Sequence, residues 1–233
     1  MDERGPGDLR TLRDVEQDLE RGIDLEKRLA WPEALEHYHR CLLDLRTIPA
    51  GPELFRVRSY GHLREANALM VLARMEEARG AFDAAIADAK ECDDGLTLSR
   101  ALLGAGVFAA NGGDLERGEA FLLRACEVAE GVSSDEGRQA LGWALLNLGG
   151  LYGKRGKLDL AFLTLHTARE RLFALGNWVG VAGAWEIDAK LRAGLGDPER
   201  ARECYAEALA MYRKEGMAEK VAQLQERIGK KVV

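Results

Sequence analysis

Proline, cysteine and aromatic residues are scarce in this chain of 233 residues. Its 5 prolines are too few to interrupt helices often, and alanine, leucine, glutamate and arginine dominate, so we expect helices almost throughout and no strands. The four cysteines lie far apart, with no CxxC pair and no Cys/His cluster. Their spacing predicts neither a disulfide framework nor a zinc site, and reduced thiols are the simplest interpretation.

Long apolar runs and an excess of positive charge are also lacking. The formal net charge is −6, which argues against nucleic acid as a partner because phosphate binding needs a positive field. No stretch approaches the roughly 20 apolar residues that a membrane span requires, and the N-terminus has no apolar signal region. We therefore expect a cytoplasmic protein without a membrane partner. With 47% hydrophobic and 31% charged residues, the chain can form both a core and a solvated surface.

What the chain does contain is an internal repeat. A small residue, an apolar residue four positions later and a second small residue three positions after that recur five times. The instances are Ala34, Tyr38, Cys41; Ala78, Phe82, Ala85; Gly118, Leu122, Ala125; Ala161, Leu165, Ala168; and Ala201, Tyr205, Ala208. This spacing places the three residues on one helix face, where small side chains let another helix approach closely. A preceding amphipathic segment carries its own small residue, predicted to face the first of each set: Gly22, Ala66, Gly106, Gly149 or Ala189.

Turn-forming residues separate the two helices of most units. Gly196 suits a helix end, Asp197 an N-cap and Pro198 a first helical position, so one helix ends and another begins there. Ser133 with Glu136 resembles a capping box at another helix start. In the first unit, Trp31-Pro32 stands where the other units have a turn.

These repeats resemble the tetratricopeptide repeat (TPR) family over about residues 8–214, and residues 145–157 are similar to the long repeats of kinesin light chains. The resemblance implies an all-α fold, a right-handed α-α superhelix or solenoid of about five helical hairpins. We expect the hairpins at residues 8–48, 52–92, 95–131, 134–175 and 177–214, a C-terminal capping helix at 215–230, and a flexible N-terminus at 1–7.

Motifs for chemistry are weak. Residues 104–109 match a GxGxxA dinucleotide fingerprint, but no strand precedes them and they fall inside an expected helix, so we predict no cofactor. His37 and His39 point away from each other on a helix and cannot share a metal ion. His62 and His166 have no partner that spacing would supply. We predict no catalytic residues, no metal site and no enzymatic activity.

In the TPR family, the first helix of each pair lines a concave surface on which partners lie as extended peptides. The resemblance implies a partner-binding groove formed by Tyr60, Arg64, Asn67, Arg100, Asn111, Trp143, Asn147, Lys154 and Lys190. Arginine, lysine and asparagine side chains in this set favour an extended acidic peptide, because guanidinium groups bind carboxylates and amides bind a peptide backbone. The alternative is structural: Leu63, Leu103 and Leu146 can pack against neighbouring helices, and Asn147 can form a local hydrogen bond.

The predicted function is therefore a non-catalytic protein–protein interaction scaffold or adaptor. One alternative is a peptide-sensing regulatory receptor, whose repeats change curvature when a signal peptide binds. The other is a self-assembling oligomerisation module, a homodimer formed through the Leu19 and Ile23 end or through the C-terminal helix. The clamp for chaperone tails needs Lys and Asn in the opening repeat, where this chain has Leu19 and Ile23, so that ligand is disfavoured.

Overall fold

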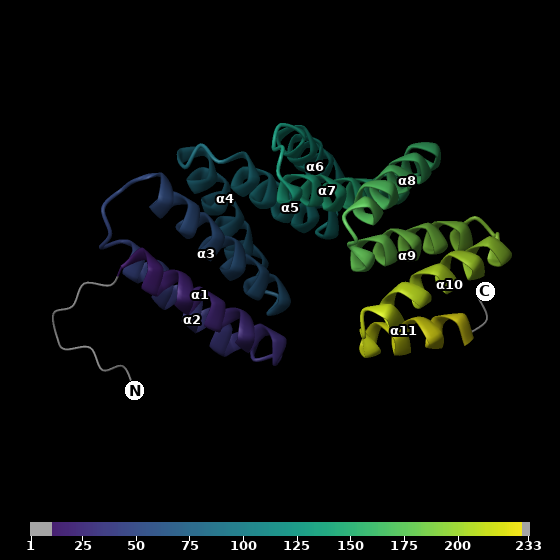
Figure 1. The fold of residues 1–233 in the computed structure, drawn as a ribbon, viewed down its shortest axis with the longest axis horizontal. Helices are drawn as coiled ribbons and strands as arrows, with labels where there is room; N and C mark the ends of the chain where they lie inside the picture. The colour runs from purple at the N-terminus through teal and green to yellow at the C-terminus, as the bar shows by residue number, and fades with distance from the viewer. Residues whose placement is uncertain (1–10, 230–233) are drawn as a thin grey trace. The chain divides into compact units, whose positions relative to one another are not determined.

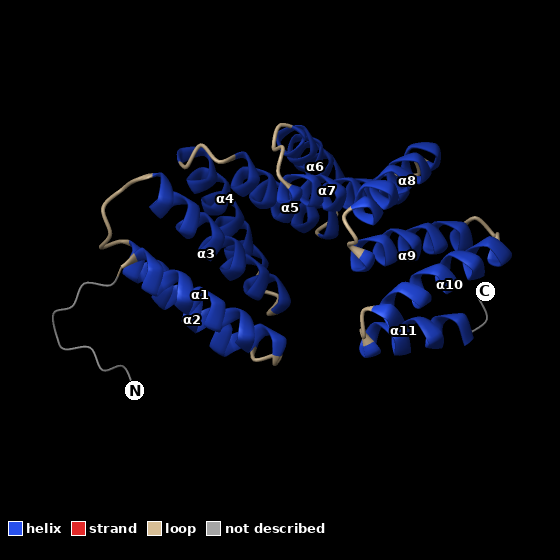
Figure 2. Ribbon diagram, viewed as in Figure 1, coloured by secondary structure: helices blue, strands red, loops and turns tan. Residues whose placement is uncertain are grey.

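The computed structural model describes residues 11–229, and helices are the only regular elements within that range (Figures 1 and 2). The helices are α1 (Leu12–Lys27), α2 (Trp31–Leu45), α3 (Pro52–Val71), α4 (Met75–Glu91), α5 (Gly95–Asn111), α6 (Leu115–Glu130), α7 (Asp135–Lys154), α8 (Leu158–Ala174), α9 (Trp178–Gly194), α10 (Pro198–Lys214) and α11 (Ala218–Gly229). The predicted flexible N-terminus at residues 1–7 lies outside the described residues. The division into five hairpins and a capping helix remains our proposal.

The chain forms two compact units, Met1–Phe108 and Ala109–Val233, and the boundary falls inside α5. We call them the N-terminal unit and the C-terminal unit and describe each by itself.

In the N-terminal unit, α1 packs on α2 and α3 packs on α4, while α1 also contacts α3. Thr11 caps α1, because its hydroxyl accepts from the Asp14 amide and the Asp14 carboxylate accepts from the Thr11 amide. The small residues of the repeat let the helices approach: a Cβ at Gly22 would lie 2.3 Å from Cε1 of Tyr38. The nearest contact at Gly22 is thus the buried Tyr38 ring rather than Ala34, the residue that the sequence pattern places opposite it.

In the C-terminal unit, α7 packs on α8 and α9 packs on α10, and α7 also contacts α9. A Cβ at Gly149 would lie 2.8 Å from Cγ of Leu165, so here too the first helix approaches the central apolar residue of the second. The last helix, α11, packs on α10 and buries Leu224 beside Tyr212. All five sets of repeat residues are buried, as their spacing predicts.

The turn before α10 confirms one prediction and the start of α7 corrects another. Gly196 follows α9 with a φ of +75°, and the Asp197 carboxylate accepts from the Arg200 amide at 3.2 Å, with Pro198 in the first turn. The N-cap of α7, however, is Ser134, whose hydroxyl accepts from the Gly137 amide, and not Ser133. The N-cap was therefore placed one residue too early, and the third helical position, Gly137, has no side chain to complete a capping box.

Candidate functional site

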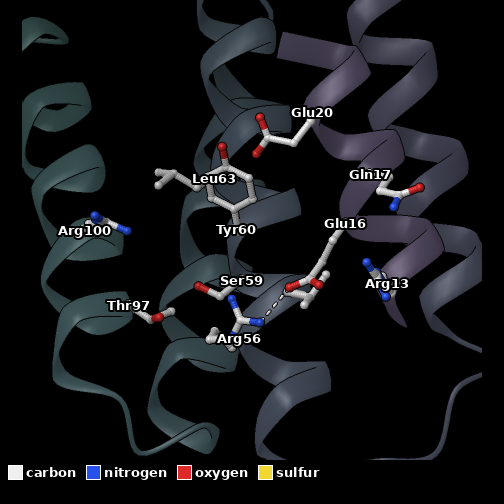
Figure 3. A pocket seen from close by; sticks show the side chains of 11 residues that line it. Arg13, Glu16, Gln17, Glu20, Arg56, Ser59, Tyr60, Leu63, Thr97 and Arg100 are labelled. Atoms are coloured by element: carbon white, nitrogen blue, oxygen red, sulfur yellow. Dashed lines mark hydrogen bonds and ion pairs between the residues drawn. The ribbon is translucent and has the colours of Figure 1, made fainter. Parts of the chain in front are cut away.

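A cavity of about 530 Å³ lies in the N-terminal unit, lined by residues of α1, α3 and α5 (Figure 3). Its lining consists of Arg13, Glu16, Gln17 and Glu20 from α1, Arg56, Val57, Ser59, Tyr60 and Leu63 from α3, and Thr97 and Arg100 from α5. Figure 3 shows α3 in the middle, with α1 on one side and α5 on the other. The cavity is therefore formed by one face each of α1, α3 and α5.

The apolar surface of the cavity comes from Val57, Tyr60 and Leu63 on α3. Val57 is buried, while Tyr60 and Leu63 are half-buried and present their remaining surface to the cavity. The buried hydroxyl of Ser59 donates its proton to the Ala85 carbonyl at 2.8 Å and so cannot donate to a ligand. An apolar or aromatic group would therefore find its best contact on Tyr60 and Leu63.

The charged side chains of the cavity include one ion pair and three residues that have no such partner in the described part of the chain. Arg56 pairs with Glu16 at 2.6 Å and also with Glu53 at 3.0 Å. For Arg13, Glu20 and Arg100, no ion pair or hydrogen bond involves another side chain among residues 11–229. All three are exposed, so they are accessible to a ligand.

Tyr60 lies between these free charges. Burial raises the pKa of the Tyr60 phenol, the nearby Glu20 carboxylate raises it further, and Arg100 opposes both. Figure 3 shows the hydroxyl end of Tyr60 turned toward Glu20. A tyrosine phenol is already neutral at physiological pH, and the raised pKa reinforces this, so Tyr60 offers a ligand one hydroxyl that can both donate and accept.

Two of the residues predicted for the groove, Tyr60 and Arg100, lie in this cavity. Arg64 serves the fold instead: it forms an ion pair with the buried Glu26, whose other oxygen accepts from the Tyr38 hydroxyl at 2.7 Å. Burial lowers the pKa of Arg64, and Glu20 opposes that shift. Asn67 is half-buried on α3 and does not line the cavity.

Asn111, at the end of α5, and the groove residues predicted on α7 belong to the C-terminal unit. Lys154 is exposed, and its ammonium donates to the Asn111 side-chain oxygen at 3.0 Å and to the Ala110 carbonyl at 3.2 Å. The Asn147 amide donates to the Trp143 carbonyl at 2.8 Å, the local bond that we set out as its structural alternative. The structure therefore brings Asn111 and Lys154 together but uses the amide hydrogens of Asn147 within α7.

On α9, Lys190 pairs with Glu186 at 2.7 Å. Burial alone would raise the pKa of the Glu186 carboxyl, but the hydrogen bond and charge of Lys190, together with Lys220 and Tyr212, lower it. Trp143 is half-buried against a core cluster that includes Leu146. Leu146 is buried in the core, as its structural alternative predicts, and Leu19 of the opening repeat is buried too.

Sequence reasoning missed most of the polar cavity lining. Arg13, Gln17 and Glu20 share the α1 face of Glu16, because positions three, four and seven apart fall on one side of a helix. The same spacing along α3 joins Arg56 to Tyr60. Extending this periodicity from Glu16 in both directions would have found them.

Other chemistry finds no support in the described part of the chain. Within residues 11–229, no group of three His, Cys, Asp or Glu side chains is arranged to hold a metal ion. The GxGxxA residues 104–109 lie inside α5, in the helix that the sequence predicts. No helix of this range is long and apolar enough to cross a membrane.

The structure has a tetratricopeptide-like helical repeat fold, since solved structures with such repeats match most of the chain. The Rap conjugation gene regulator of plasmid pLS20, solved with the Phr* peptide, has a TM-score of 0.74 and 19% identity over 96% of this chain and 62% of that chain. Bacillus thuringiensis PlcR, solved with the peptide PapR7 and DNA, has a TM-score of 0.72 and 12% identity over 91% and 74%.

A Podosopora anserina kinesin-light-chain-like protein with nearly identical TPR-like repeats has a TM-score of 0.67 and 12% identity over 90% of this chain and 100% of that chain. No protein-family model matches the sequence. No curated protein matches it either. At these identities the resemblance establishes the fold and confirms the predicted all-α repeat architecture.

Proposed function

We propose that this chain is a non-catalytic binding module that holds an extended acidic peptide segment of a partner protein against its first helices. The observation that carries the proposal is the cavity of about 530 Å³ lined by α1, α3 and α5. It combines an apolar surface at Tyr60 and Leu63 with cations at Arg13 and Arg100, the mixture that peptide grooves use for contact area and orientation.

Peptide complexes of proteins with this fold support a peptide ligand. The Rap regulator was solved with the Phr* peptide and PlcR with the peptide PapR7 and DNA. All four cysteines are buried and form no disulfide with one another, which supports our placing the protein in the cytoplasm, where thiols stay reduced.

The experiment is a selection of random linear peptides, displayed on phage, against the full chain, followed by affinity measurements of the enriched peptides. Arg100→Glu reverses the charge of an exposed cavity residue. We expect it to weaken the enriched peptides at least about tenfold, because a charge-assisted hydrogen bond is lost and repulsion replaces it. Arg40→Glu is the matched control, since Arg40 is an exposed arginine of the same unit that lies on α2 outside the cavity.

The proposal is supported if the enriched peptides bind the wild type and Arg40→Glu with equal affinity but bind Arg100→Glu more weakly. Failure to enrich any peptide, or equal binding by all three proteins, contradicts binding in this cavity. Circular dichroism of each variant checks that its helices are intact.

A second candidate is a peptide-sensing receptor, favoured by the likeness to the Rap regulator and PlcR. A sensor must change conformation where the peptide does not touch it, whereas a passive scaffold need not. Hydrogen exchange with and without an enriched peptide separates the two. Changed protection in α9 and α10 supports a sensor, and changes confined to α1, α3 and α5 support a scaffold.

A further inference from the structure

We propose that the cavity of the N-terminal unit selects a peptide segment of mixed charge, with carboxylates for Arg13 and Arg100 and one cationic group for Glu20. This inference rests on the proposed peptide-binding function and names the chemistry of its ligand. It refines the acidic ligand to one that also carries a single positive group.

The first step is the count of charges that a ligand would meet. Of the five charged residues lining the cavity, Arg56 and Glu16 neutralise each other through their ion pair of 2.6 Å. Two cations and one anion remain: Arg13, Arg100 and Glu20. A ligand that pairs with all three carries two negative groups and one positive group.

The second step is the placement of these charges. Figure 3 shows Arg100 on α5 at one side of the cavity, and Arg13 and Glu20 on α1 at the other. Glu20 lies two helical turns from Arg13, so one wall itself presents both signs. A peptide lying across Tyr60 would meet the cation Arg100 on the α5 side. On the α1 side it would meet the cation Arg13 and the anion Glu20.

The third step is the cost of the wrong ligand. A carboxylate beside Glu20 would be repelled, and it would also disturb Tyr60, whose hydroxyl end faces Glu20. Arg64 acts electrostatically on Glu20, but its guanidinium is paired with Glu26. Glu20 therefore repels polyanions and attracts a cationic group of the ligand. A single charge of this kind contributes to specificity more than to affinity.

The test uses short, terminally blocked, fluorescently labelled peptides in an acidic, a mixed and a neutral pool. The acidic pool combines Asp and Glu with Leu and Phe, the mixed pool replaces one acidic residue by Lys, and the neutral pool replaces Asp and Glu by Asn and Gln. Fluorescence anisotropy gives their affinities for the wild type, Glu20→Gln, Arg100→Gln and the control Arg40→Gln. Glu20 is exposed on α1, so the substitution leaves the core intact.

We expect the mixed pool to bind the wild type most tightly. Glu20→Gln should weaken the mixed pool about fivefold and strengthen the acidic pool about fivefold, because it removes an attraction from one and a repulsion from the other. Arg100→Gln should weaken both pools roughly tenfold, and Arg40→Gln should change neither.

The sign of the Glu20→Gln effect decides the inference. Strengthening of both pools, or no change in either, overturns the mixed-charge ligand while peptide binding itself stands. If no pool binds the wild type, the proposed function fails together with the inference.

Discussion

The turns of the two units make the same hydrogen bonds with different residues. In the N-terminal unit, Leu29 and Ala73 hold the left-handed position after a helix, with φ values of 60° and 58°. In the C-terminal unit, glycine holds that position in every turn of this kind, at Gly113, Gly156, Gly176, Gly196 and Gly216. In both units, the backbone amide of the residue after the left-handed position donates to the equivalent carbonyl of the preceding helix. Ala30 donates to Leu25 and Asp197 to Arg192, each at 3.0 Å.

The difference shows how little a turn depends on its own residue when the flanking helices pack well. An L side chain in the left-handed region costs roughly 1–2 kcal/mol, which glycine avoids. Leu29 and Ala73 bear that cost because the helices on either side bury their faces against each other. The N-terminal unit therefore contains local strain that the C-terminal unit lacks.

Buried ion pairs give the largest contrast to test. Asp188 in the C-terminal unit is 1% exposed and is held by two arginines, Arg169 at 3.0 Å and Arg192 at 2.6 Å. Asp88 in the N-terminal unit is held mainly by Arg58. We expect Asp188→Asn to lower the free energy of unfolding by about 3–5 kcal/mol, since it removes a buried carboxylate and leaves two partly buried guanidinium groups without their counter-charge.

Asp88→Asn should cost less, about 2–3 kcal/mol, because only one arginine loses its counter-charge at close range. Urea unfolding measures both losses, and hydrogen exchange shows whether each loss stays within its own unit. An equal or larger loss for Asp88→Asn would contradict the comparison.

The next largest losses of stability are expected where glycine lets two helices of a unit approach closely. Gly22→Ala places a Cβ 2.3 Å from the Tyr38 ring, and Gly149→Ala places one 2.8 Å from Leu165. We expect losses of about 2 and about 1 kcal/mol, because a buried ring between helices yields less easily than a leucine side chain. The free energy of unfolding in urea measures them.

Gly80→Ala is the matched control for these substitutions. Gly80 lies inside α4 with no atom within 4 Å of an added Cβ, so helix propensity alone acts there. We expect a gain of about 0.5–1 kcal/mol. A loss at Gly80 comparable to that at Gly22 would show that the close approach is not the cause.

The turns provide a smaller and opposite pair of effects. Ala73→Gly should stabilise the N-terminal unit by about 0.5 kcal/mol, because it relieves the left-handed strain at some cost in chain entropy. Gly156→Ala should destabilise the C-terminal unit by about 1 kcal/mol for the converse reason. The thermal unfolding temperatures of the two variants should shift in opposite directions from that of the wild type. Shifts of the same sign would refute the comparison of turns.

Acid sensitivity gives the smallest effect. The pKa of Glu186 is lowered despite its burial, so its carboxylate stabilises the C-terminal unit above the unfolded-state pKa, and this contribution is lost as pH falls through the lowered pKa. The pKa of Asp94 in the N-terminal unit is lowered likewise by hydrogen bonds from Thr97 and Leu96, against burial. Glu186→Gln should flatten the decline of stability in acid, measured by urea unfolding from neutral pH downward. An unchanged pH profile would exclude this role.

The sequence by itself determined the helices and their buried faces. Helical period and the spacing of small residues are local properties, so Ala34, Phe82 and Leu165 could be assigned to the core without coordinates. The turn at Gly196 was equally visible, because glycine, Asp197 and Pro198 each report a backbone conformation. The turn at Leu29 gave no such signal, since no residue type marks a strained position that packing imposes.

Only the tertiary structure decided which charges are free. Arg64 and Arg100 look alike as cations on first helices, but the fold brings Glu26 against Arg64 and leaves Arg100 open to the cavity. Pairing of this kind joins residues on different helices, so it depends on how α1, α3 and α5 lie against one another rather than on any spacing within one helix. For that reason the sequence could predict a binding face, while the cavity and its mixed charge required the assembled unit.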